Sequence, residues 1–272
     1  YTYEDSVLVK LNGFGASSID LLVSAYLRTA DMTRFLQMQN DLNLDLMDVM
    51  QKNGVDFAFP STSVYIGAHG NLLEENAINC QVLKIHNPIL TNTDLMKIRS
   101  MKREGFKVVT LPITYYKNTS LQKALDHLFV EADRAHKDGA NILILSDRGV
   151  DENHVAIPSL LAVAGLNQHL VETKKRTSLA VILESGEPRE VHHFATLLGY
   201  GACAINPYLV QDTIKNLIDE HMLDKDYYAA IDDYNNAVIH GIVKIASKMG
   251  ISTIQSYQGS KIFEAIGIDS EV

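Results

Sequence analysis

Residues 141–149, Asn-Ile-Leu-Ile-Leu-Ser-Asp-Arg-Gly, join a short apolar run to a charged turn. An apolar run of this length, with no polar alternation, is typical of a strand that is buried on both faces of a parallel sheet. The pattern returns at residues 179–190, where Leu-Ala-Val-Ile-Leu precedes Glu-Ser-Gly-Glu-Pro-Arg-Glu. A helical segment separates the two runs, so the pair predicts a right-handed β-α-β connection.

Strand and helix signals alternate on both sides of these two runs. The expected strands are residues 82–85, 107–111, 141–145, 179–183 and 202–205. The expected helices are residues 94–102, 121–137, 154–173, 188–198, 210–221 and 227–248. This alternation predicts an α/β fold, and we expect an incomplete or deviant (β/α) barrel-like parallel sheet.

Residues 1–66 follow a different pattern, in which two strands precede a helix and a last strand. The expected strands are residues 7–11, 18–27 and 63–66. Asp31 has the side chain to cap the helix between them. We therefore expect a small α+β (ferredoxin-like) domain here, followed by the α/β domain at residues 67–272.

The composition is that of a globular protein with a sizeable core, since 46% of the 272 residues are hydrophobic and 21% are charged. The formal net charge of -9, without a clustered basic face, argues against a nucleic-acid partner. No apolar run approaches the roughly 20 residues that cross a bilayer, and we expect no signal peptide. We therefore expect a cytoplasmic protein in which Cys80 and Cys203 are reduced thiols. Because the chain starts at Tyr1 rather than Met, it has the look of a fragment.

Two polar loops follow predicted strands, at the edge where α/β folds bind ligands. The first loop contains Asp147 and Arg148, and the second contains Glu184, Glu187 and Arg189. These charges can bind a polar ligand or line a polar passage. Alternatively, Asp147–Arg148 and Glu184–Arg189 are ion pairs, with helix caps, that hold the strand ends. We favour this structural interpretation because such ion pairs are common.

Groups that carry chemistry are not evident in the sequence. His192 and His193 are neighbours on an expected helix, so their side chains point about 100° apart and do not converge on one metal ion. The chain has no Gly-x-Gly-x-x-Gly after a strand, no phosphate loop and no nucleophile motif. We predict no catalytic, cofactor-binding or metal-binding residue in this chain.

Several stretches carry a family resemblance. The two longest are LSDRGVDENHVAIPSLLAVAGLNQHL at residues 145–170 and ESGEPREVHHFATLLGYGACAINPY at residues 184–208. Shorter ones are GNLLE at 70–74, PILTN at 88–92, KMGISTIQSY at 248–257 and KIFEAIG at 261–267. In this order they resemble the central domain of the glutamate synthase large subunit, from about residue 67 to the end but without that domain's first segment.

The resemblance implies a supporting role in a larger enzyme. In that family an amidotransferase domain releases ammonia from glutamine, and a domain with FMN and an iron–sulfur cluster uses the ammonia and 2-oxoglutarate to form glutamate. Electrons come from NADPH, NADH or ferredoxin, in some members through a small electron-donating subunit. The central domain links the two other domains, holds no cofactor and helps to form the ammonia tunnel, so this fragment alone is expected to be inactive. The resemblance implies these tunnel or domain-contact residues: Thr91, Asn92, Asp147, Arg148, Glu184, Glu187, Arg189 and His192.

Residues 1–66 resemble a different family. The stretches LNGFGASSIDL at 11–21 and VDFAFPSTSVY at 55–65 look like the carboxy-terminal α/β domain of small mechanosensitive channels. The join falls near Tyr65–Gly67, and the chain is then a chimera, by real fusion or by an assembly artefact. The alternative function is therefore the cytosolic domain of a mechanosensitive ion channel with an unrelated tail. A free-standing barrel enzyme that uses the two charged loops is the third hypothesis.

Overall fold

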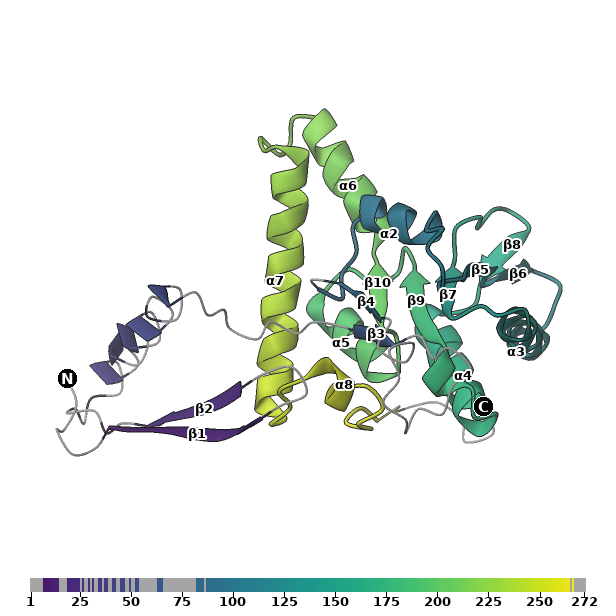
Figure 1. Cartoon of the computed structure of the whole chain (residues 1–272). Coiled ribbons are helices and arrows are strands. Elements are labelled where there is room, and N and C mark those ends of the chain that lie inside the picture. Colours follow the sequence, from purple (N-terminus) through teal and green to yellow (C-terminus); the bar gives the residue numbers. More distant parts are fainter. Residues whose placement is uncertain are drawn as a thin grey trace. The chain divides into compact units, whose positions relative to one another are not determined.

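The structure, a computed structural model, describes residues 87–264 without interruption. It also describes residues 7–14, 19–24, 63–65, 82–85 and 266, and scattered positions between 26 and 53. The chain forms two compact units, Tyr1–Phe59 and Pro60–Val272. The second unit contains the parallel sheet and its helices (Figure 1).

The described strands are β1 (Leu8–Phe14), β2 (Ile19–Ser24), β3 (Ser63–Tyr65), β4 (Val82–Lys84), β5 (Val108–Pro112), β6 (Thr114–Tyr116), β7 (Ile142–Ser146), β8 (His154–Ala156), β9 (Ala180–Glu184) and β10 (Ala204–Asn206). The described α-helices are α2 (Asn92–Arg99), α3 (Leu121–Lys137), α4 (Ser159–Glu172), α5 (Val191–Gly199), α6 (Tyr208–Asp219), α7 (Tyr227–Lys248) and α8 (Ile254–Tyr257). A short 3₁₀ turn, η3, spans Arg176–Ser178.

In the first unit, β1 and β2 form an antiparallel hairpin with an irregular register between Leu11 and Gly13. Asp31 accepts a hydrogen bond of 2.8 Å from the main-chain N–H of Arg34, which is the cap that the sequence predicts.

The expected strand at residues 63–66 exists as β3, but it belongs to the second unit, where it pairs antiparallel with β4. The separate domain at residues 1–66 stays a prediction. Cys80 and most of the predicted join at residues 65–67 lie outside the described residues.

Four parallel strands form the main sheet of the second unit, in the order β10-β9-β7-β5. The α/β class predicted from the apolar runs is confirmed. A further parallel bridge joins Ile89 to Ile205, so the segment before α2 lies beside β10. The two central strands, β7 and β9, are buried along their whole length.

Alternate residues of β7 point into two different cores. Leu143 and Leu145 belong to the larger core, which contains residues of α3, α4, α5 and α7. Ile142 and Ile144 belong to the smaller core, which contains Leu95 of α2. Because each face of the strand meets a helical layer, a continuous apolar run is more stable here than an alternating one.

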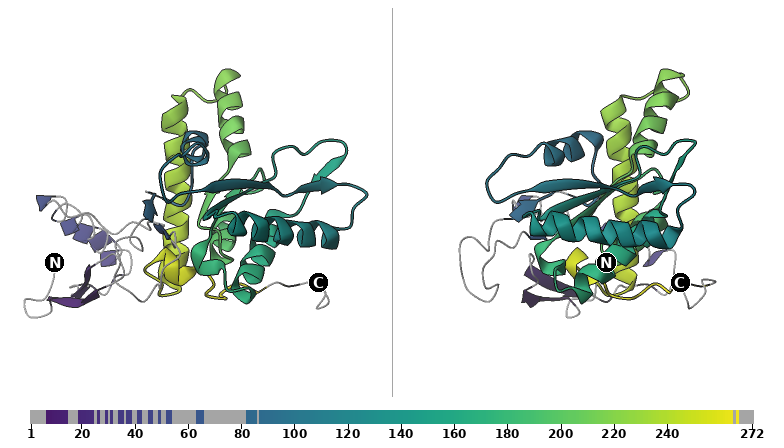
Figure 2. Two further views of the ribbon diagram at one scale, coloured as in Figure 1. Left: turned by 45° about the vertical axis from the view of Figure 1, so that its right-hand side comes forward. Right: turned by 90° about the vertical axis from the view of Figure 1, so that its right-hand side faces the viewer.

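The winding of the sheet is that of a barrel segment. Strands that follow one another in the chain lie side by side, and α3, α4 and α5 pack on the same face (Figures 1 and 2). Right-handed crossovers that always step in one direction place every helix on one side, as in a barrel. The smaller core with α2 covers the opposite face, which would be the barrel interior. The sheet is therefore an open, deviant segment of a barrel, as predicted.

Two helices begin later than the sequence predicts. The helix expected at residues 154–173 begins at Ser159, because residues 154–156 form β8 and pair antiparallel with β6. This two-stranded ribbon extends beyond the parallel sheet, to the right in the left view of Figure 2. The helix expected at residues 188–198 begins at Val191, with Glu190 as its N-cap. Pro188 therefore lies in the loop before α5 and not in its first turn.

Substitution of Gly241 tests the packing of α7 on α5. A Cβ atom at Gly241 would lie 2.5 Å from both methyl carbons of Val191. Alanine normally stabilises a helix by about 1 kcal/mol relative to glycine. We expect the clash to reverse that sign, so that Gly241→Ala lowers the free energy of unfolding by about 1–3 kcal/mol.

Urea denaturation of the wild type, the two single variants and the double variant gives the coupling between these positions. Val191→Ala removes the clashing methyl groups, so Gly241→Ala in that background should be neutral or stabilising. Equal destabilisation by Gly241→Ala in both backgrounds would contradict the packing described here.

Candidate functional site

Polar side chains meet where the parallel strands end. Ser146, Glu184 and Asn206 are the last residues of β7, β9 and β10, and they are in register with one another. Together with the residues that follow them, they form what we call the strand-end cluster: Ser146, Asp147, Arg148, Glu184, Ser185 and Asn206. All but Arg148 are buried. Polar groups without water as a partner must find partners in the protein.

Glu184 is the centre of this cluster. Its side chain is 3% exposed, and it accepts hydrogen bonds from three donors. Oε2 accepts from Arg99 Nη2 and Ser146 Oγ, each at 2.6 Å, and Oε1 accepts from Arg148 Nε at 2.7 Å. The two arginine side chains are 42% and 44% exposed, so the buried end of each pair is the carboxylate.

The electrostatics of Glu184 follow from these contacts. Burial by itself raises the pKa of a carboxyl group, because it disfavours the charged form. Hydrogen bonds from Ser146, Arg148 and Arg99 outweigh burial and hold the pKa of Glu184 below its ordinary value. Glu184 is therefore a carboxylate, without a proton to donate, at neutral pH.

Asp147 uses its carboxylate to hold the next loop. It accepts hydrogen bonds from Ser185 Oγ at 2.6 Å and from the main-chain N–H of Gly186 at 3.0 Å. Burial and a hydrogen bond to Asp147 raise the pKa of the Tyr208 hydroxyl. The guanidinium of Arg148 lies 3.9 Å from the centre of the Tyr208 ring, a cation–π contact.

The start of α2 reaches the same edge. Thr91 is the N-cap, and its Oγ1 accepts a hydrogen bond of 3.1 Å from the main-chain N–H of Asp94. Asn92 Oδ1 accepts a hydrogen bond of 3.0 Å from Asn206 Nδ2. Since Ser185 N–H donates to the main-chain carbonyl of Asn206 at 3.1 Å, a chain of contacts joins Asn92 to the strand-end cluster.

Glu187, Arg189 and His192, which the sequence also proposed, follow this cluster in the chain, and the main-chain N–H of Glu187 donates a hydrogen bond of 3.1 Å to Ser185 Oγ. The Glu187 carboxylate accepts from the main-chain N–H of Ser159 at 3.0 Å and from Ser159 Oγ at 2.5 Å, so it caps α4. Glu187 and Arg189 line a pocket of about 280 Å³ beside α4 and α5. His192 is exposed and meets the edge of Phe263, with ring centres 5.6 Å apart.

The structure corrects the predicted ion pairs and adds residues that the sequence did not suggest. The expected pair Glu184–Arg189 is wrong, because Glu184 pairs with Arg99 and Arg148. Arg148 likewise pairs with Glu184 and not with its neighbour Asp147. The missed residues are Ser146, Arg99, Asn206 and Gln211. One feature of the sequence pointed to Asn206, namely its position directly after the predicted apolar strand at residues 202–205.

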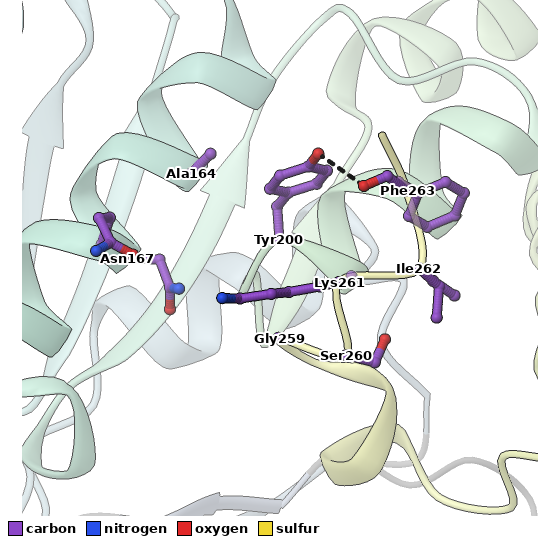
Figure 3. A pocket seen from close by; sticks show the side chains of 10 residues that line it. Ala164, Asn167, Tyr200, Gly259, Ser260, Lys261, Ile262 and Phe263 are labelled. Carbon is purple, nitrogen blue, oxygen red and sulfur yellow. Dashed lines mark hydrogen bonds between the residues drawn. The ribbon is translucent and has the colours of Figure 1, made fainter. Parts of the chain in front are cut away.

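A second pocket of about 280 Å³ lies between the middle of α4 and the end of α5 (Figure 3). Residues 259–263 form one wall, and Asn167 of α4 and Tyr200, the C-cap of α5, also line it. Tyr200 Oη donates a hydrogen bond of 3.4 Å to the carbonyl of Phe263 (Figure 3). None of the predicted site residues lines this pocket.

Within the described part of the chain, no three His, Cys, Asp or Glu side chains are grouped so as to hold a metal ion. No helix among the described residues has both the length and the apolar character needed to span a membrane.

Replacement of Glu184 by glutamine tests the strand-end cluster. We expect Glu184→Gln to lower the free energy of unfolding by about 2 kcal/mol at pH 7, since two cationic hydrogen bonds are weakened. A lowered pKa stabilises the folded state above the ordinary value of about 4.3, and that contribution is lost as the pH falls through the folded pKa. The difference between variant and wild type should therefore shrink below about pH 4.

Denaturant titrations at pH 7 and at about pH 3, below the range in which the contribution of Glu184 begins to fall, measure this difference. The exposed Glu172, which accepts from Gln168 on the same helix, gives the control Glu172→Gln, expected within about 0.5 kcal/mol of wild type. A deficit in Glu184→Gln that does not depend on pH would show that its charge is not what stabilises the cluster.

Comparison with known proteins places the chain in a family. The family model described as glutamate synthase central domain matches residues 56–269. The match begins inside the segment 1–66, whose likeness to a channel domain stays a prediction. A solved structure of the L230A mutant of flavocytochrome b2 with benzoylformate covers 65% of this chain and 41% of its own, with 13% identity and a TM-score of 0.41.

Curated relatives agree with the family model. The glutamate synthase [NADPH] large chain of Bacillus subtilis is 43% identical over 212 residues, which are 78% of this chain and 14% of that protein. Ferredoxin-dependent glutamate synthase 2 of Synechocystis is 36% identical over 226 residues, again 78% of this chain and 14% of that protein. The chain thus spans about one seventh of the length of these relatives. Because the family model covers most of the sequence, the chain belongs to the glutamate synthase central domain family.

Proposed function

We propose that this chain is the cofactor-free linking part of a glutamate synthase. In the complete enzyme an amidotransferase domain would hydrolyse glutamine, and the ammonia would travel to an FMN domain that also carries the iron–sulfur cluster. There it would condense with 2-oxoglutarate, and reduction of the imine would give glutamate. The electrons come from NADPH, NADH or ferredoxin, and a cytoplasmic location is part of the same proposal.

The observation that carries this proposal is the closure of the strand-end edge by the chain's own groups. Barrel enzymes bind substrates and cofactors at this edge. Here Glu184 is engaged by three donors, and Asp147 is engaged by Ser185 and Gly186. The start of α2 lies against the end of β10. Such an edge fits a rigid wall better than a reaction centre.

The charge state of the wall also suits a passage for ammonia. A carboxylic acid next to the path would protonate ammonia and convert it into an ammonium ion that does not react. The lowered pKa of Glu184 keeps this group ionised near neutral pH, so it has no proton to give. Of the eight proposed residues, Thr91, Asn92, Asp147, Arg148 and Glu184 therefore suit the tunnel wall. The Glu187 carboxylate, Arg189 and His192 contact groups beyond the cluster and suit contacts with a neighbouring domain.

Replacement of Asn92 or Arg148 by alanine in the complete enzyme tests this role. We expect glutamine-dependent glutamate formation to fall roughly tenfold, because the path is distorted, while glutamine hydrolysis continues. Added ammonium salt should restore part of the glutamate formation, because it bypasses the path. The measurement is the ratio of glutamate formed to glutamine hydrolysed, with Glu172→Ala as the surface control. Parallel loss of both activities would mean misfolding instead of uncoupling.

The cofactor-free proposal has its own test. The purified chain is mixed with FMN, the excess is removed by gel filtration, and the protein is examined for flavin absorbance. We expect no retained flavin, since the strand-end edge is already occupied by protein groups. A yellow protein with stoichiometric FMN would overturn the proposal.

A further inference from the structure

The segment before α2 is held only briefly by the sheet. The main-chain N–H of Leu90 donates to Ile205 at 2.8 Å, and the N–H of Ile205 donates to Pro88 at 2.7 Å. The chain then turns into α2, so the Leu90 carbonyl and the Asn92 N–H have left the ladder. Buried main-chain groups need partners, and Leu90 is almost fully buried. Side chains must therefore take over at this turn.

Gln211 replaces the missing strand partner. Its Oε1 accepts a hydrogen bond of 2.9 Å from the Asn92 N–H, and its Nε2 donates one of 3.0 Å to the Leu90 carbonyl. One side-chain amide thus pairs with two main-chain groups, as a peptide unit of a neighbouring strand would. Gln211 is 1% exposed, and it is the one residue of α6 that is buried. A polar residue in the best-buried position of an amphipathic helix indicates a role in recognition more than in packing.

Asn206 completes the arrangement from the end of β10. Its Nδ2 donates to the Leu90 carbonyl at 3.0 Å and to Asn92 Oδ1 at 3.0 Å. The Leu90 carbonyl therefore accepts two hydrogen bonds, one from each amide. The Oδ1 atom of Asn206 is buried without a hydrogen-bond partner. The two donated hydrogen bonds thus orient the Asn206 side chain, although this orientation leaves its Oδ1 atom without a hydrogen bond.

We infer that Gln211 and Asn206 are positioning residues that fix the turn of residues 90–92 against the strand-end cluster. Their hydrogen bonds join residues that are 114 to 121 positions apart in the sequence. The turn therefore stays in place only when α6 and β10 are correctly folded. The inference rests on the proposed function, in which Thr91 and Asn92 belong to the wall of the ammonia path. Gln211 and Asn206 would thus set how well glutamine hydrolysis is coupled to glutamate formation.

Amide hydrogen exchange in the 272-residue chain tests the geometry. Gln211→Leu keeps a side chain of similar size and removes both hydrogen bonds. Gln211→Glu keeps an oxygen for the Asn92 N–H but replaces the donor to the Leu90 carbonyl by a second oxygen. We expect exchange at Asn92 to speed up roughly tenfold or more in Gln211→Leu and by less than that in Gln211→Glu. The Leu90 N–H, bonded to Ile205, is the internal reference, and Asn216→Ala, an exposed position on the same helix, is the matched control.

The ratio of glutamate formed to glutamine hydrolysed in the complete enzyme tests the consequence. We expect Gln211→Leu to lower this ratio at least roughly threefold, Gln211→Glu to lower it less than Gln211→Leu does, and Asn216→Ala to leave it unchanged. Unchanged exchange at Asn92 in Gln211→Leu would overturn the inference. The inference would also be overturned if Asn92→Ala lowers the ratio while Gln211→Leu leaves it unchanged. In that case the proposed function would still stand. If Asn92→Ala also leaves the ratio unchanged, the proposed function fails and the inference fails with it.

Discussion

A single buried carboxylate determines much of this structure. An ionised group at the end of a central strand is stable only if its neighbours provide enough hydrogen bonds to replace water. For Glu184 those neighbours are Ser146 and Arg148, at the end of the adjacent strand, and Arg99, at the end of α2. The hydrogen bonds that Glu184 accepts thus join β9 to the end of β7 and to α2, the helix that covers the smaller core.

The same constraint bears on the proposed role of this domain as a wall. In a barrel segment, the ends of the strands and the interior face are the natural place for a ligand. Here α2 packs against that face through Leu95 and Ile98, and its first residues are hydrogen-bonded at the strand ends. Polar groups that could otherwise select a substrate are hydrogen-bonded to one another and to the start of α2. This arrangement agrees with the chain's membership of a domain family that makes up one part of a long enzyme.

Local patterns predicted the elements well and their partners poorly. The apolar runs at residues 141–145 and 179–183 located β7 and β9 to within one residue, and α3 and α7 have the predicted bounds. The partner of Glu184 was sought five residues away in Arg189, whereas Arg99 lies 85 positions away. Gln211 could not be identified as a site residue, because its partners at Leu90 and Asn92 are brought to it only by tertiary folding. The β8 strand was missed because its pairing with β6 outweighs a weak helical pattern.

The close contact between α7 and α5 has a mechanical meaning. Gly241 sits against Val191, the first residue of α5, and Tyr234 of the same long helix donates a hydrogen bond to the Arg189 carbonyl. Two points along α7 therefore contact the end of the loop that follows β9 and the first residue of α5. A displacement of α7 along its axis would thus be transmitted to this loop, and through it to the end of β9.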